Sequence, residues 1–449
     1  MSLSSAIVEN YIAPLWASHE KSDYIKISRE LKKAESLSLE ERRETQWELL
    51  KLIVHSAFEH CPYYRKKYQA VGFHPGDLKT WEDFEAVPVL TKKEIRENAM
   101  ELIAQNADRS DFVPRKTSGS TGVSLSFYSS DSEFQFKRGV TLYRDQWSGW
   151  RLGEWQAMVW GNPEYKKSWR GYLRNYLLER GLYLDTLKMD EAMMKDFARR
   201  ILKKRPTLLF GHAHSLYLFA KFWENENLPQ ISFKGIISTA MVLHSHEREK
   251  CEQVFGSRLF DRYGCEEVSL IASECEAHQG LHTNSDSLVV EVVGSTKQAT
   301  TENEGAVIVT DLRNMVMPFI RYQVGDMAVA EEKACSCGRT YPLLKSISGR
   351  IADYLISPEG QWISGISLTE NFATLIPGLE QVQIVQEKKD FLRLRIVSAP
   401  DFNDKSMAEI NRLVLERFGA SMKYEIEKIE KVEPTASGKY RFAINKIQE

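Results

Sequence analysis

Short apolar stretches alternate with helical patterns over the central part of this chain, and this alternation is the feature that most constrains its fold. The stretches with the length and apolar character of buried strands are 208–210, 235–238 and 257–260. The helical patterns that separate them lie at about 190–204, 214–226 and 244–255. Strands that alternate with helices pair in parallel, so the region from about 112 to 345 is predicted to be an α/β domain with a largely parallel central sheet.

The segments on either side of this core have other patterns. The first 110 residues or so are predicted to be mostly helical, since apolar residues recur at helical spacing between Gln46 and Tyr68, and Thr91–Glu94 has the pattern of a helix start. Strand patterns continue over 287–293 and 306–310, so the α/β core extends toward residue 345.

The pattern changes again at Ser348-Gly349-Arg350. Beyond it lie strand patterns at 379–386, 391–397 and 424–432, and an amphipathic helix at about 405–418. This arrangement predicts a small α+β domain with an antiparallel sheet. We therefore divide the chain into an N-terminal domain, 1–349, and a C-terminal domain, 350–449.

Charge and hydropathy exclude several classes of protein. The 60 basic and 62 acidic side chains give a net charge of −2, which provides no general attraction for nucleic acid. No apolar run approaches the roughly 18 residues of a transmembrane helix. The first 16 residues lack the basic cluster and apolar stretch of a signal peptide, so we expect a cytoplasmic protein.

One short segment has the composition of a phosphate-binding loop. Its small residues let backbone N–H groups converge on an anion, and its hydroxyls can donate to the oxygens of that anion. The segment consists of Thr117, Ser118, Gly119, Ser120, Thr121 and Gly122. Similar clusters also form ordinary turns, so the loop alone does not decide between the two interpretations.

Further polar segments could complete a nucleotide site. Asp261-Arg262-Tyr263-Gly264-Cys265-Glu266-Glu267 follows a predicted strand, where a carboxylate could hold Mg²⁺ and Tyr263 could stack on a base. A turn that ends in solvated acids is the alternative. Asp326 follows a glycine and could accept both hydroxyls of a ribose. Lys439, on a glycine-flanked loop near the C-terminus, could reach a phosphate, although most terminal lysines are merely solvated.

In their order and separation, these segments resemble the motifs of the adenylate-forming (ANL) superfamily, and the resemblance covers nearly the whole chain. Within it, the chain looks most like the phenylacetate–CoA ligase and CapK-like branch. The segments that carry this resemblance are His60-Cys61-Pro62-Tyr63-Tyr64-Arg65, Pro88-Val89-Leu90-Thr91-Lys92 and Cys335-Ser336-Cys337-Gly338-Arg339.

The resemblance implies a fold and a set of roles. The fold would be a large N-terminal α/β adenylate-forming domain with a small mobile α+β C-terminal domain. Residues 117–122 would hold the phosphates of ATP, with Thr121 among the catalytic residues, and Glu267 would be associated with Mg²⁺. Asp326 would bind the ribose with help from Arg350, and Lys439 would stabilise the transition state. The nucleotide site would also include Asp261, Tyr263 and Gly264.

The acid pocket departs from the pattern of the superfamily. Thr239-Ala240-Met241 stands where many relatives carry a glycine–glutamate pair, so Ala240 and Met241 would form a less polar pocket. His212, which follows a predicted strand, is a further candidate for contact with the substrate. Ala352 occupies the hinge position where many members have Asp or Lys.

Four residues form a separate candidate metal site within 275–337. Cys275, His282, Cys335 and Cys337 supply three sulfurs and one imidazole, a closed ligand set for structural zinc. His278 is a competing ligand, and four reduced core residues are the alternative. The pairs His212/His214 and His244/His246 could also bind metal, but such pairs more often serve as caps or surface contacts.

These observations predict ATP-dependent conversion of a small-molecule carboxylic acid to acyl-AMP, followed by transfer to a thiol, with coenzyme A as the expected acceptor. Transfer to a carrier protein or an amine is the alternative, and a non-catalytic nucleotide-binding homologue is a rival of another class. A homodimer is possible. The basic, aromatic-rich segment 165–180 could contact a membrane or an acidic carrier, but we favour a core-packed helix with a solvated basic face.

Overall fold

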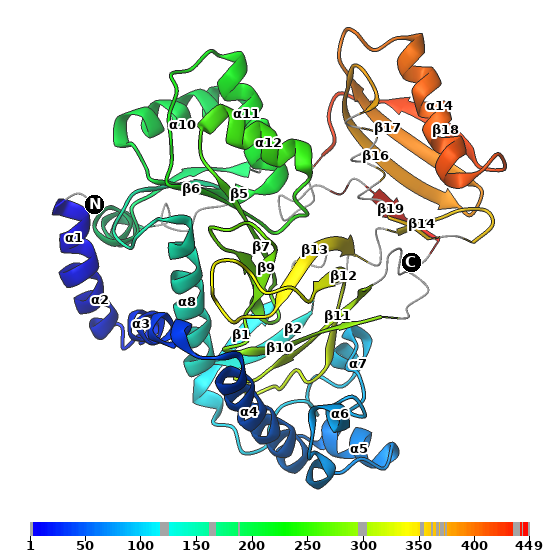
Figure 1. Cartoon of the computed structure of the whole chain (residues 1–449). Helices are drawn as coiled ribbons and strands as arrows, with labels where there is room; N and C mark the ends of the chain where they lie inside the picture. Colours follow the sequence, from blue (N-terminus) through cyan, green and yellow to red (C-terminus); the bar gives the residue numbers. More distant parts are fainter. Residues whose placement is uncertain are drawn as a thin grey trace.

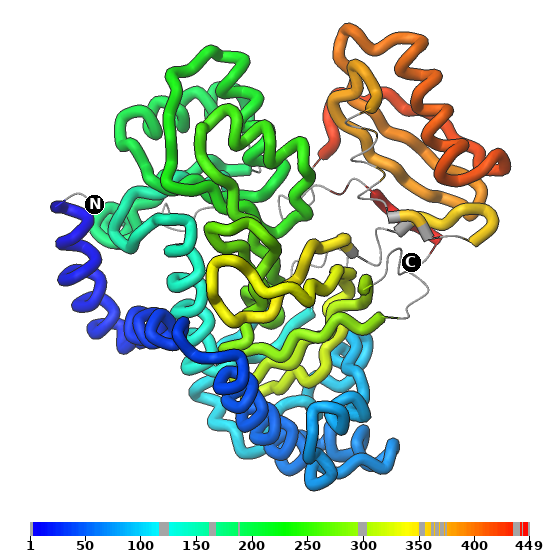
Figure 2. The backbone as a smooth tube through the Cα atoms, viewed as in Figure 1, coloured from blue at the N-terminus to red at the C-terminus, as the bar shows by residue number. Residues whose placement is uncertain are grey.

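The chain folds into a large domain and a smaller C-terminal domain, which are seen in Figures 1 and 2. The computed structural model describes residues 3–116, 125–160, 168–186, 189–294, 303–350, 354–360, 362–364, 368, 372, 375–433, 441 and 443–447. An 11-stranded sheet is the centre of the large domain, with the order β10-β11-β12-β13-β9-β8-β7-β6-β5-β3-β4.

The strands of this sheet are of very different length. Their bounds are β3 Gln156–Val159, β4 Gly181–Leu184, β5 Leu208–His212, β6 Gly235–Thr239, β7 Leu259–Cys265, β8 Ser269–Glu274, β9 Leu281–Thr283, β10 Leu288–Val293, β11 Glu304–Asp311, β12 Tyr322–Glu331 and β13 Leu343–Arg350.

Only one half of the sheet is parallel. The neighbouring pairs β4/β3, β3/β5, β5/β6 and β6/β7 are parallel, as the alternation of strands and helices predicts. From β7 through β8, β9, β13, β12 and β11 to β10, all the pairs are antiparallel, so the prediction of a largely parallel sheet was wrong for this half. The reason is that no helix separates β7 from β8 or β11 from β12, whose connections are fully described, and a chain that turns back directly pairs antiparallel.

The three helices predicted around the parallel half are confirmed within a residue or two. They are α10 Glu191–Lys204, α11 Ala213–Asn225 and α12 Ser245–Phe255, which Figure 1 shows in the upper green lobe. Phe197, Phe219 and Phe255, one from each helix, are fully buried in one cluster with apolar residues of β5, β6 and β7. The apolar faces of these helices therefore hold the strand ends in place.

The N-terminal segment is helical, as predicted. Its helices are α1 Leu3–Ile7, α2 Ala13–His19, α3 Tyr24–Lys33, α4 Leu39–His60, α5 Pro62–Ala70, α6 Trp81–Phe84 and α7 Lys92–Glu97. The helical pattern from Gln46 to Tyr68 is divided between α4 and α5 at Cys61, because Pro62 lacks a backbone N–H and disfavours helical geometry in the residue before it. The predicted helix start at Thr91 is confirmed, since its hydroxyl accepts from the Glu94 backbone N–H.

Two short strands flank the candidate phosphate loop. They are β1 Phe112–Lys116 and β2 Ser126–Ser130, which pair antiparallel, and α8 Asp131–Asp145 begins directly afterwards with Ser130 as its cap. Helix α8 packs against α3 and β8. Residues 117–124, which lie between β1 and β2 and include the candidate loop, are outside the described residues.

The C-terminal domain has a helix on a four-stranded sheet with the order β18-β17-β16-β19. Its elements are β16 Leu379–Lys388, β17 Phe391–Ser398, α14 Asp404–Phe418, β18 Lys423–Lys428 and β19 Ala443–Asn445, preceded by the hairpin β14 Tyr354–Ile356 and β15 Trp362–Ser364. Only β16/β17 is antiparallel, so the predicted antiparallel sheet is corrected to a mixed one. Helix α14 is the crossover that makes β17 and β18 parallel.

The aromatic-rich segment after residue 165 differs from its expected packing. Helix α9 spans Trp169–Arg174, and a π-helical turn follows over Asn175–Glu179. The large side chains Trp169, Tyr172, Leu173 and Tyr176 are exposed, so the favoured interpretation of a core-packed helix was wrong for these four. None of the described helices is long and apolar enough to cross a membrane.

Candidate active site

Two of the predicted nucleotide-binding residues contact each other, and a third is their neighbour in the sheet. The hydroxyl of Tyr263 on β7 donates to Oδ2 of Asp326 on β12 at 2.8 Å. Asp326 in turn pairs with Arg350 in the register of β12 and β13. Side chains of β7 and β12, which are far apart in the sequence, therefore come into contact.

Gly264 is required by the close approach of two backbones. A Cβ atom at this position would lie 2.4 Å from the carbonyl oxygen of Ser269 on β8. Any larger residue would therefore push apart the hairpin between β7 and β8, which carries Glu266 and Glu267. Gly264 shapes the site through packing.

Glu267 is a buried carboxylate with two polar partners. It accepts a hydrogen bond from the hydroxyl of Tyr322 at 2.9 Å and forms an ion pair with Nζ of Lys92 at 3.1 Å. Burial by itself would raise the pKa of Glu267, but the ammonium of Lys92 and the hydrogen bonds outweigh it and lower the pKa below its ordinary value. Glu267 is therefore ionised, as a ligand of a hard cation must be.

Lys92 is a site residue that the sequence did not reveal as one. A backbone ladder holds its segment beside β12, where the N–H of Leu90 donates to the carbonyl of Arg321 and the N–H of Gln323 donates to the carbonyl of Leu90, both at 2.9 Å. This contact places Lys92, the first residue of α7, next to Glu267. The motif 88–92 was informative only as a family resemblance, because a lysine in the first turn of a helix is usually solvated.

Glu266 and Arg115 form a second ion pair near the candidate phosphate loop. Their closest atoms, Nη2 and Oε1, are 2.7 Å apart, and Arg115 lies on β1 just before residues 117–122. Both residues line one end of a cavity of about 270 Å³ that also touches α8. The pair thus connects the β7–β8 hairpin to the strand that enters the loop.

Asp261 contacts residues of both neighbouring strands, β6 and β8. Its Oδ1 accepts from the hydroxyl of Ser238 at 3.1 Å, and its backbone N–H donates to Glu274 at 2.9 Å. Burial, and then the negative charge of Glu274, raise the pKa of Asp261 to about 7. These contacts indicate that Asp261 cross-links β6, β7 and β8.

We expect Asp261→Asn to flatten the pH dependence of stability. In the unfolded chain this carboxyl titrates near its ordinary value of about 3.9. Since the folded state keeps the extra proton up to about pH 7, the free energy of unfolding of the wild type falls as the pH rises between these two values. The variant lacks this fall and should melt at a higher temperature than the wild type at about pH 8. A variant that melts lower there and has lost AMP binding would instead make Asp261 a nucleotide ligand.

The candidate acid-binding residues lie at the carboxyl ends of β5 and β6. His212 ends β5, is buried, and has its ring centroid 4.1 Å from that of Trp160, which follows β3. His212 is paired in register with Thr239. Ala240 comes next, with a φ of 66°, a conformation unusual for a residue with a Cβ atom, and Met241 follows it. Trp160 is a further candidate for contact with the acid that the sequence analysis did not single out.

The four predicted metal ligands form one cluster. The ligand atoms of Cys275, His282, Cys335 and Cys337 all lie within 4.8 Å of one another. Sγ of Cys275 is 3.6 Å from Sγ of Cys335, and Sγ of Cys337 is 3.3 Å from Nε2 of His282. Three sulfurs and one imidazole nitrogen at this separation fit a tetrahedral metal ion.

The surroundings of the cluster suit a metal. Nδ1 of His282 donates to the carbonyl of Tyr341 at 3.2 Å, which leaves the lone pair of Nε2 directed at the cluster. Burial lowers the pKa of His282 to about 4, so its ring is neutral, as a ligand requires. The competing candidate His278 lies outside the cluster, because its Nδ1 interacts with Glu274 at 3.2 Å.

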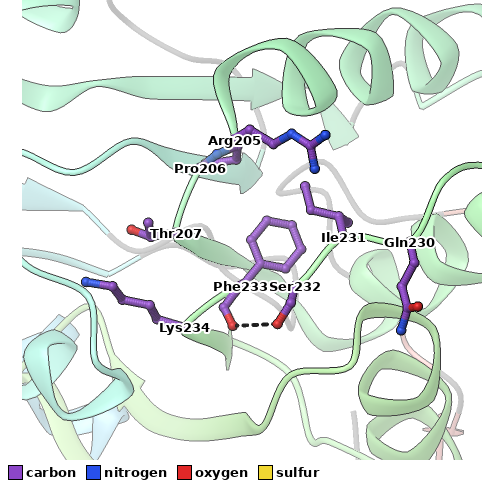
Figure 3. Close-up of a pocket in the computed structure, with 8 residues that line it drawn as sticks. All are labelled: Arg205, Pro206, Thr207, Gln230, Ile231, Ser232, Phe233 and Lys234. Carbon is purple, nitrogen blue, oxygen red and sulfur yellow. Dashed lines mark hydrogen bonds between the residues drawn. The ribbon is translucent and has the colours of Figure 1, made fainter. Parts of the chain in front are cut away.

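A surface pocket of about 330 Å³ lies away from these residues (Figure 3). Its lining residues Thr207 and Lys234 directly precede β5 and β6, so the pocket is at the amino ends of these strands. Parallel sheets bind ligands at the carboxyl ends of their strands, where His212 and Thr239 lie. We therefore do not include this pocket in the candidate site.

Two predicted elements lie outside the described residues. They are the loop Thr117–Gly122, which contains Thr121, and Lys439. Their roles stay predictions. The nearest described residues are Lys116 and Leu125 for the loop, and Glu433 and Arg441 for Lys439.

Comparison with known proteins supports the resemblance stated from the motifs. Residues 355–446 match the family described as the CapK C-terminal domain. The chain is 24% identical to Protein CapK of Staphylococcus aureus over 379 residues, which are 83% of this chain and 82% of that protein. It is 25% identical to the phenylacetate-coenzyme A ligase of Thermus thermophilus over 337 residues, 72% of this chain and 73% of that enzyme.

The fold is also that of solved ligase structures. A 2-hydroxyisobutyryl-CoA ligase in its postadenylation state, in complex with R3-HIB-AMP, has a TM-score of 0.74 at 21% identity and covers 92% of this chain and 91% of its own. The same ligase in its thioester-forming state, with 2-HIB-AMP and CoA, has a TM-score of 0.59. The sequence identity is the same in the two comparisons, so the chain superimposes better on the postadenylation structure.

Proposed function

Because this chain is a relative of CapK and the phenylacetate–CoA ligases and has the fold of adenylate-forming CoA ligases, we propose that it activates a carboxylic acid with ATP and transfers the acyl group to coenzyme A. The first half-reaction gives acyl-AMP and pyrophosphate. The second gives the acyl-CoA thioester and AMP.

The contacts of Tyr263 and Glu267 with residues of β12, the strand that carries Asp326, are the observation that carries this proposal. Tyr322 links the two carboxylates structurally, since it lies on β12 with Asp326 and donates to Glu267. Asp326 would accept the hydroxyls of the ribose, and the ring of Tyr263 would lie against the base. Glu267 would hold Mg²⁺, which neutralises charge on the phosphates. Lys92 balances the buried charge of Glu267.

The chemistry follows from this placement. An oxygen of the substrate carboxylate attacks the α-phosphorus of ATP, the new O–P bond forms, and the bond to the β-phosphate breaks to release pyrophosphate. Negative charge grows on the phosphate oxygens, and N–H groups of residues 117–122 and the ammonium of Lys439 would oppose it. In the second half-reaction the thiol of coenzyme A attacks the acyl carbon, its proton is released, and AMP leaves.

The acid would lie between Trp160, His212 and the segment 239–241. Trp160 and His212 present ring faces, and Ala240 and Met241 are apolar, so a small acid with a flat or apolar body fits these side chains. Relatives named as phenylacetate ligases favour an aromatic acid among these. The thiol and imidazole cluster would hold a structural zinc ion, because its four ligands leave no open position for a substrate.

A pyrophosphate-exchange screen over diverse carboxylic acids tests the proposal. At least one acid should give ATP-dependent exchange, and adding coenzyme A should then yield a thioester. Parallel reactions with carrier proteins or amines would identify another acceptor. No exchange with any acid of a broad panel, aromatic and aliphatic, would contradict the proposal and favour a non-catalytic nucleotide-binding protein.

A further inference from the structure

A continuous chain of hydrogen bonds connects the two domains. It begins at the backbone N–H of Val432, which donates to Oε1 of Gln381 on β16 at 3.1 Å. The amide nitrogen of Gln381 is 3.3 Å from Nε2 of His214 on α11. Nδ1 of His214 is 2.7 Å from Oε1 of Glu247 on α12. Four residues from two domains therefore form one polar path.

The direction of each hydrogen bond follows from the first. A backbone N–H can only donate, so Oε1 of Gln381 accepts from Val432 and the NH₂ group of the same amide must face His214. His214 then accepts at Nε2 and carries its proton on Nδ1, which donates to the carboxylate of Glu247. The cross-domain contact thus needs a neutral His214 in one tautomer, and Glu247 selects that tautomer.

Glu247 is itself held firmly. It is buried, and its other oxygen accepts from the backbone N–H of His244 at 3.3 Å, in the capping box that starts α12. Burial would raise the pKa of Glu247, but the hydrogen bond from His214 and the nearby histidines lower it, so the carboxylate stays ionised. His214 is also buried and lies in the first turn of α11. The large domain therefore presents a preorganised acceptor to Gln381.

The path ends beside the segment that carries Lys439. Val432 follows β18, and the chain then continues into residues 434–440. At the other end, His214 is two residues beyond the pocket candidate His212. The contact thus connects the edge of the acid pocket to the base of the Lys439 loop.

We propose that His214 is a positioning residue for the adenylation half-reaction, which docks the C-terminal domain against α11 through Gln381. This inference rests on the proposed function. The chain superimposes better on the postadenylation than on the thioester-forming structure of the solved ligase, which supports assigning the contact to the first half of the cycle. Domain rotation before thioester formation would break it.

Two substitutions at one position separate docking from local structure. His214→Asn keeps an amide donor near the position of Nδ1, for Glu247, but has no atom at the position of Nε2. His214→Gln reaches that position with a carbonyl oxygen that can accept from Gln381. We expect His214→Asn to lower pyrophosphate exchange by about fivefold, the effect of one neutral hydrogen bond, while His214→Gln stays closer to the wild type.

The second half-reaction provides the internal comparison. With presynthesised acyl adenylate and coenzyme A, His214→Asn should form thioester at least as fast as the wild type. Gln381→Leu should behave like His214→Asn, and the double variant should be no slower in exchange than the slower single variant. Glu409→Gln changes a residue of α14 that pairs with Arg412 on the same helix, so it is the control and should leave both half-reactions unchanged. Equal losses in both half-reactions, or full additivity, would overturn the proposal.

Hydrogen exchange of the backbone tests the docking contact independently of the proposed activity. In hydrogen exchange with ATP present, peptides that cover 379–383 and 429–433 should exchange faster in His214→Asn than in the wild type, at unchanged melting temperature. If no acid supports exchange of pyrophosphate but these peptides still respond, the proposed function fails while the docking contact holds. If exchange of pyrophosphate is normal in His214→Asn and the peptides do not respond, the docking contact is wrong while the proposed function stands.

Discussion

Replacing Lys439 with alanine is expected to lower the rate of adenylation by about 10²- to 10³-fold, the usual cost of removing one preorganised group that stabilises developing charge. The ends of its loop are anchored by described contacts. Gln381 holds the N–H of Val432 on one side, and Nε2 of Gln383 donates to the carbonyl of Arg441 at 2.7 Å on the other. Residues on both sides of the loop are therefore held by contacts that do not involve Lys439. Removing the lysine side chain should affect catalysis without unfolding the domain.

Pyrophosphate exchange and the melting temperature together measure this effect. Lys431→Ala is the matched control, because Lys431 is exposed on the same segment and pairs only with the exposed Glu433 at 3.2 Å among its described contacts. It should leave the exchange rate unchanged. Binding of presynthesised acyl adenylate should survive in Lys439→Ala. Near-normal exchange in that variant would remove Lys439 from the mechanism.

Loss of the metal cluster is expected to have the largest effect on stability. Purified protein should contain about one zinc ion per chain, since Cys275, His282, Cys335 and Cys337 supply one complete set of ligands. Cys335→Ser should lose this metal and lower the free energy of unfolding by about 3–5 kcal/mol, because metal binding stabilises only the folded state. Metal analysis and thermal melts with and without a chelator measure both changes.

Ser336→Ala is the control for the cluster. Ser336 lies between two of the ligands, but its backbone N–H, which donates to Oε1 of Gln279 at 2.9 Å, is kept in the variant. The variant should therefore retain zinc and stability. A wild-type preparation that is free of metal, unaffected by the chelator and fully stable would show that the four residues are only packed side chains.

Local patterns predicted the elements of this fold well, and contacts between distant segments explain where prediction stopped. Helices α10, α11 and α12 were found from their apolar periodicity, because each buries one stripe of side chains. The antiparallel pairing of strands β8 through β13 was not predicted. The partner of a short apolar strand can be inferred from the sequence only when a helix or a tight turn fixes the connection. The mixed sheet of the C-terminal domain was missed for the same reason.

In the candidate site, too, local motifs were predictable and contacts between distant segments were not. Tyr263, Glu267 and Asp326 could be proposed because they lie in recognisable motifs, and the four candidate metal ligands because cysteine and histidine are rare and chemically distinctive. Lys92 was missed as a site residue, because it approaches Glu267 only after its segment pairs with β12. The contact between His214 and Gln381 joins residues 167 positions apart, and neither residue type signals such a partner.

The polar path between the domains also limits how freely the C-terminal part could be exchanged between related enzymes. Gln381 and Val432 lie within the segment 355–446, whereas His214 and Glu247 lie in the other part of the molecule. A hybrid enzyme joined at the boundary near residue 350 would combine these two sides from different parents. Such a hybrid should be fully active only when the residues at 214 and 381 come from the same parent. The part that must be exchanged therefore includes a residue outside the C-terminal domain.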